Sequence, residues 1–151
     1  MNEIERVHEQ LKRAFEGPAW SGPSVLEVLE GVDAAQAARR PITGAHSVWE
    51  IALHIGTWED AVRRRALGEK ADVSDEENFP TISEPTAKAW EAAIARIRSG
   101  HMELRKVVAA FDPKRIDEPL VPGGSTAYVQ FHGAAQHDLY HAGQIAVLRK
   151  G

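Results

Sequence analysis

Four long segments of the chain carry apolar residues at alternating spacings of three and four, the pattern of one face of an α-helix. They predict helices over about residues 2–16, from 47 to the start of a loop at 66, over about 84–111, and from 125 or 126 to about 149. Each helix has one apolar stripe, which must be buried against another helix. The sequence therefore predicts an all-α fold, a four-helix bundle.

The second of these segments has the clearest start signal. Ser47 and Glu50 have the S-x-x-E spacing of a capping box, in which each side chain satisfies a backbone N–H of the first turn. The stripe that follows consists of Val48, Ile51, Ile55, Trp58 and Val62. In the third segment Pro85 suits a first helical turn.

The connections between the helices are long. Residues 17–46 contain two short capped turns, which begin at Ser24 and Asp33. Residues 66–83 are acidic and polar, and residues 112–125 are rich in proline and glycine and cannot continue a helix. Long crossover connections favour a topology other than simple up-down-up-down. We expect one domain over residues 1–151.

Composition excludes several classes of function. A net charge of −4 argues against a nucleic-acid partner, and no apolar stretch approaches the ~20 residues of a membrane span. The absence of cysteine excludes disulfides, thiolate ligands and a cysteine nucleophile. The segment MNEIERVHEQ is too charged for a secretory signal, so we expect a cytoplasmic protein.

The candidate site rests on three of the seven histidines. His137 and His141 lie one helical turn apart, on a face shared with small and apolar residues. Buried imidazoles are costly without partners, and one metal ion would satisfy both. His54, on the margin of the stripe of another helix, could supply a third ligand across the bundle. Three neutral nitrogens leave coordination positions open, as in catalytic metal sites.

Other interpretations of these residues stay open. A histidine pair at this spacing arises by chance in such a chain, and a hydrogen-bonded core histidine is the ordinary alternative, as we expect for His101. Glu50 could hold the second nitrogen of His54 or act only in the capping box. Asp138 could orient an imidazole or a water, or face solvent. Glu50 and Asp138 are the candidate catalytic residues.

Two hydrolase motifs do not explain the chain. HDLYH resembles the H-E-x-x-H helix of zinc peptidases with Asp138 in place of glutamate, but no sheet is predicted that would hold a peptide. No G-x-S-x-G elbow is present for a serine nucleophile.

The segments AHSVWEIALHIGTWE, with His54, and HDLYHAGQIAVLRK, with His137 and His141, resemble the DinB-like (DinB/YfiT) superfamily. The resemblance covers nearly the whole chain. It implies an up-down-down-up four-helix bundle, a three-histidine site for a divalent metal ion such as nickel or zinc, and a homodimer. Trp20, Trp49 and Phe79 lie outside the four stripes and could anchor a dimer or pack under a loop.

The resemblance also suggests a chemistry. Some members of the superfamily are transferases or isomerases that use bacillithiol or mycothiol. We therefore expect a metal-dependent thiol S-transferase that joins a low-molecular-weight thiol to a small electrophile. The alternatives are a metal-dependent hydrolase assisted by Asp138 or Glu50, and a non-catalytic, stress-associated metal-binding protein. Whether the chain is an enzyme is left open at this point.

Overall fold

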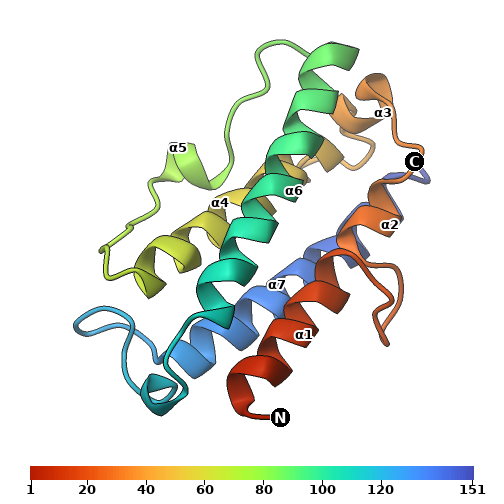
Figure 1. Ribbon diagram of the computed structural model, residues 1–151. Helices are drawn as coiled ribbons and strands as arrows, with labels where there is room; N and C mark the ends of the chain where they lie inside the picture. The colour runs from red at the N-terminus through yellow and green to blue at the C-terminus, as the bar shows by residue number, and fades with distance from the viewer.

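The computed structural model describes residues 1–151, and the chain is all-helical. The four long helices are α1 (Glu3–Phe15), α4 (Val48–Ala66), α6 (Ala87–Ala109) and α7 (Ala127–Leu148). They lie side by side, with α4 packed against α6 and α7, and α1 packed against the same two helices (Figure 1). The prediction of four long helices is confirmed.

Local capping sets where the long helices begin. The N-caps are Asn2, Ser47, Thr86 and Thr126, each of which accepts a backbone hydrogen bond from the first turn. The predicted capping box of Ser47 and Glu50 is present. The third helix begins slightly later than predicted, because Thr86 caps it and leaves Pro85 outside the helix.

The connections contain short helices. The two predicted capped turns are α2 (Val25–Leu29) and α3 (Ala34–Ala38), with α2 packed on α7, and α3 on α4 and α6. The acidic loop holds one further turn, α5 (Asp75–Asn78), and a 3-10 turn, η1 (Pro113–Arg115), precedes α7. Neither of the last two was predicted, since a single turn is too short to show helical periodicity.

The core consists of two apolar clusters, of 18 and 13 buried residues. Buried polar residues interrupt the apolar stripes between these clusters. On α4, Glu59 lies between Ile55 of the first cluster and Val62 of the second. On α6, His101 separates Ile97 from Leu104 in the same way. The bundle therefore has a polar layer across its middle.

On α7 the polar layer is formed by Asp138 and His141, which lie between Ala135 of the second cluster and Ala142 of the first. None of the helices is both long and apolar enough to cross a membrane.

Candidate metal centre

Helices α4 and α7 bring the three predicted histidines together. His54 Nε2 lies 3.0 Å from His137 Nε2, which in turn lies 3.1 Å from His141 Nε2. His54 and His141 are buried, and His137 is half-buried. These nitrogens are close enough to bind one metal ion. The structure is thus consistent with the predicted three-histidine centre for a divalent metal ion.

The outer nitrogens of two of these rings have their own partners. His54 Nδ1 lies 2.8 Å from the backbone oxygen of Asn78, and His141 Nδ1 lies 2.6 Å from Gln144 Oε1. Because both partners are acceptors, each Nδ1 carries the proton and donates it. The Nε2 atoms of His54 and His141, which point inward, are then unprotonated and each has a free lone pair. This is the form of imidazole that binds a metal ion.

This arrangement leaves too few protons for the centre. His137 Nε2 lies against two lone pairs and has at most one proton to donate. In neutral imidazoles, at least one pair of nitrogens about 3 Å apart therefore faces lone pair to lone pair. A cation between them would turn this repulsion into three favourable contacts, so the residues fit the implied metal ion.

The electrostatics keep the rings neutral. Burial, together with the neighbouring His141 and His54, lowers the pKa of His137 to about 3. Burial also lowers the pKa of His54 and of His141. Neutral imidazoles are the metal-binding form, so little proton competition is expected near neutral pH.

The segment around α5 closes one side of the centre. The Phe79 ring stacks on His54 at 4.2 Å between ring centroids and on His46 at 3.7 Å. The Asn78 side chain accepts a hydrogen bond from Trp58 Nε1 at 2.8 Å. Sequence reasoning missed Asn78, because a backbone carbonyl that holds a distant imidazole has no signature in the sequence.

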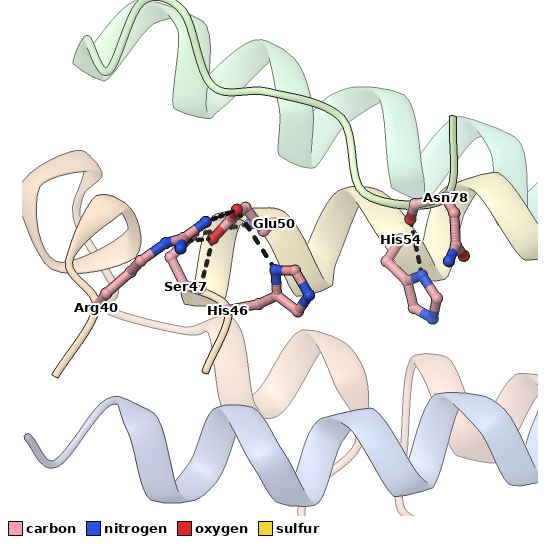
Figure 2. A network of polar contacts seen from close by, with 6 residues as sticks. All are labelled: Arg40, His46, Ser47, Glu50, His54 and Asn78. Atoms are coloured by element: carbon pink, nitrogen blue, oxygen red, sulfur yellow. Dashed lines mark hydrogen bonds and ion pairs between the residues drawn. The ribbon is translucent and has the colours of Figure 1, made fainter. Parts of the chain in front are cut away.

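Of the two alternatives for Glu50, the structure shows the capping box with Ser47 rather than a contact with His54. Its carboxylate accepts hydrogen bonds from the backbone N–H of Ser47 and from the Arg40 guanidinium, and lies 3.5 Å from His46 Nδ1 (Figure 2). Burial opposes ionisation, but these hydrogen bonds outweigh it and lower the pKa of Glu50 to about 2. Glu50 is thus an ionised carboxylate fixed at the start of α4, one turn from His54.

Asp138 lies in the core, which excludes the solvent-facing alternative. It is fully buried, and it is grouped with Glu59 and His101 rather than with the three histidines. His101 is a buried core histidine as predicted, with Nδ1 at 2.8 Å from Glu59 Oε1. Sequence reasoning did not single out Glu59, because an acidic residue within a helix usually faces solvent.

A cavity of about 650 Å³ adjoins the centre, with His141 in its wall. No acidic or basic side chain other than histidine lines it; besides His141 the wall contains Ile42, Ala45, His46, Ile51, Phe79, Tyr140, Gly143, Gln144, Val147 and Leu148. Its size suits a small organic ligand, and its lining suits one without net charge.

The family profile of the DinB superfamily matches residues 19–145 of the chain. This chain belongs to the DinB superfamily. The matched region contains all three histidines and both candidate catalytic carboxylates, Glu50 and Asp138. Neither the curated proteins nor the solved structures contain a match to the chain. Membership of the superfamily does not determine the chemistry, which depends on the residues of the site.

Proposed function

We propose that this DinB superfamily protein is a metal-dependent thiol S-transferase that joins a low-molecular-weight thiol to a small electrophile. One observation carries the proposal. The Nε2 atoms of His54, His137 and His141 converge within 3.0–3.1 Å along the chain of contacts, while the outer nitrogens of His54 and His141 are held by acceptors. Nickel and zinc are the proposed ions, because both bind imidazole well.

A bound divalent ion would supply positive charge that favours a thiolate over its thiol, whose ordinary pKa is ~8.5. The histidines contribute by staying neutral, so that the full charge of the ion is available. His54 and His141 are oriented for this by Asn78 and Gln144. The chain has no cysteine, so the reacting sulfur would come from the co-substrate.

The cavity beside His141 is the proposed electrophile subsite. Its lining, which contains no acidic, lysine or arginine side chain, favours a small apolar electrophile over a charged one. In the reaction a carbon–sulfur bond forms, the bond to the leaving group breaks, and the proton of the thiol accompanies the leaving group into solvent. His46 and Tyr140 line the same cavity and are placed to contact the electrophile.

Metal-dependent hydrolysis assisted by Asp138 or Glu50 is less well supported. Such assistance needs a free carboxylate beside the ion as general base. Glu50 is held by Arg40 and Ser47, and Asp138 is buried with Glu59 and His101. The catalytic roles expected of Glu50 and Asp138 stay predictions.

We also propose that residues 1–151 form one domain in the up-down-down-up order of the superfamily. Both core clusters draw on helices from the two halves of the chain, which supports a single unit. The long connections on both sides of α4 leave room for crossovers along the bundle.

The test is a thiol-dependence assay on protein loaded with Ni²⁺ or Zn²⁺. Cysteine, glutathione, bacillithiol and mycothiol would be offered with a small uncharged electrophile, and thioether formation followed by mass spectrometry. Turnover with at least one thiol, lost in His141→Ala, is expected. Metal-dependent turnover with water alone would favour hydrolysis, and tight metal binding without any turnover would favour a non-catalytic protein.

A further inference from the structure

A second cluster of metal-ligating side chains lies in the middle of the bundle. It consists of Glu59 on α4, His101 on α6 and Asp138 on α7, whose ligand atoms all lie within 4.8 Å of one another. Glu59 and His101 are 1% exposed and Asp138 is 0% exposed. Phe15 of α1 stacks on the His101 ring at 4.1 Å between centroids and closes that side of the cluster.

Most polar atoms of this cluster have no hydrogen-bond partner. His101 Nδ1 and Glu59 Oε1 lie 2.8 Å apart. The remaining atoms are buried and unpaired, namely Glu59 Oε2, His101 Nε2, and Oδ1 and Oδ2 of Asp138. Buried polar atoms are nearly always paired in folded proteins, so such a concentration at one point calls for a bound ion or for a proton between the carboxyl groups of Glu59 and Asp138.

The cluster also has two carboxyl groups and no lysine or arginine among its members. His101 makes one contact with them, from Nδ1 to Glu59 Oε1 at 2.8 Å. The nearby Arg105 is already paired with Glu16, at 2.6 Å. Burial raises the pKa of Glu59 to about 8 and the pKa of Asp138 well above its ordinary value, so both carboxyl groups hold protons when no cation is bound. A divalent cation would take the place of these protons and neutralise both groups at once.

We propose that Glu59, His101 and Asp138 form a second divalent-cation site, distinct from the three-histidine centre. Two carboxylates and one imidazole are harder ligands than three imidazoles. They suit Mn²⁺, Fe²⁺ or Zn²⁺. An ion there would link α4, α6 and α7 through one ligand each. Because α4 also carries His54 and α7 also carries His137 and His141, this ion would hold the two helices that shape the three-histidine centre, called the outer centre from here on.

The buried position determines how the site is loaded. None of the three side chains lines any of five cavities of about 330–770 Å³ in the molecule. The ion should therefore enter while the chain folds. The probe is Mn²⁺, added during refolding from urea, and the readout is the number of ions per chain by elemental analysis after gel filtration.

The variants separate the two sites. His54→Ala/His141→Ala disables the outer centre and should still retain one Mn²⁺ per chain. Adding Glu59→Gln to this variant should remove the remaining Mn²⁺. Glutamine keeps the size of the side chain and can still hydrogen-bond His101. Asp138→Asn in the same background serves as a second test if the Glu59 variant fails to fold. Wild-type protein refolded with Zn²⁺ should hold two ions, and EDTA without denaturant should remove one of them rapidly and the buried one slowly.

Two outcomes would overturn the proposal. The first is a folded His54→Ala/His141→Ala variant, with native far-UV circular dichroism, that holds no Mn²⁺ and no Zn²⁺; protons shared between the carboxyl groups would then fill the cluster. The second is full retention of the ion in the folded Glu59→Gln or Asp138→Asn variant. A wild-type protein that holds only one Zn²⁺ per chain would likewise count against the second site.

Discussion

At the residue scale, the contacts of His137 make it the most informative of the three histidines to change. Its Nε2 is the atom that lies within hydrogen-bonding distance of both other Nε2 atoms. We predict that His137→Ala weakens binding of Ni²⁺ or Zn²⁺ at the outer centre by more than the ~10- to 100-fold typical of losing an outer partner of a ligand. Equilibrium dialysis with elemental analysis measures this.

The matched control is His132→Ala. His132 lies on the same helix but its Nε2 pairs with Glu3, at 2.8 Å, away from the centre. The His132→Ala variant should bind the metal ion as the wild type does. Unchanged affinity in His137→Ala would show that the three histidines do not form the centre.

The carboxylate of Glu50 provides a pH-dependent contribution to stability. Its pKa is lowered from 4.5 to about 2 in the folded protein, so its ionised form stabilises the fold fully above pH 4.5, and this contribution is lost as pH falls toward 2. We predict that Glu50→Gln lowers the free energy of unfolding at pH 7 by about 2 kcal/mol. Urea unfolding of both proteins at pH 7 and pH 3 should show a smaller difference at pH 3. An equal difference at both pH values would contradict the role of the charge.

At the scale of elements, Gly56 sets how closely α4 approaches α6. A Cβ atom at this position would lie 3.0 Å from Ile97 Cγ2, which is tighter than ordinary packing. We predict that Gly56→Leu destabilises the protein by about 1–3 kcal/mol, because the larger side chain forces the helices apart. Thermal unfolding followed by circular dichroism measures the loss.

Gly133 on α7 is the matched control, since nothing lies within 4 Å of a Cβ added there. Gly133→Ala should raise the stability by up to about 1 kcal/mol through helix propensity alone. Equal effects of the two substitutions would show that the α4–α6 contact does not depend on Gly56.

Helix boundaries were predictable at this scale because they depend on neighbours in the sequence. Ser47 and Glu50 are three residues apart and form the box that starts α4. The turn α5 was missed, although Ser74 and Glu77 form an equivalent box, because four residues show no apolar stripe. That omission matters for the site, since Asn78 and Phe79 at the end of α5 contact His54.

At the scale of the whole molecule, the bundle should not depend on the outer metal ion. The two core clusters of 18 and 13 residues are apolar, and the three histidines lie outside both. We predict that brief EDTA treatment abolishes turnover while leaving most of the far-UV circular dichroism signal intact. Turnover that survives complete removal of metal would exclude the proposed mechanism.

The expected homodimer is also a property of the whole molecule. Of the three aromatic residues outside the predicted stripes, Trp49 is buried against Trp90, Phe79 stacks on His54, and Trp20 is fully exposed. We predict a dimer of about twice the 16.6 kDa chain mass by sedimentation at micromolar concentration, weakened by Trp20→Ala. A single 16.6 kDa species in the wild type would contradict it.

The sequence alone determined where the long helices lie in the chain and which two candidate metal ligands share one helix. Stripes, caps and the spacing of His137 and His141 depend on residues within a turn or two of each other, and the backbone geometry of a helix makes such relations readable from the chain. The position of His54 on the margin of its stripe allowed it to reach across the bundle but did not require it.

Only the tertiary structure decided which distant groups meet. Glu59 and His101 are 42 residues apart, and His54 and His137 are 83 apart. Whether such residues touch depends on the rotation and separation of packed helices, and a turn of a helix by one residue would bring different side chains inward. For this reason Asp138, which could have faced solvent or the outer centre by its sequence context, lies in the core with Glu59 and His101.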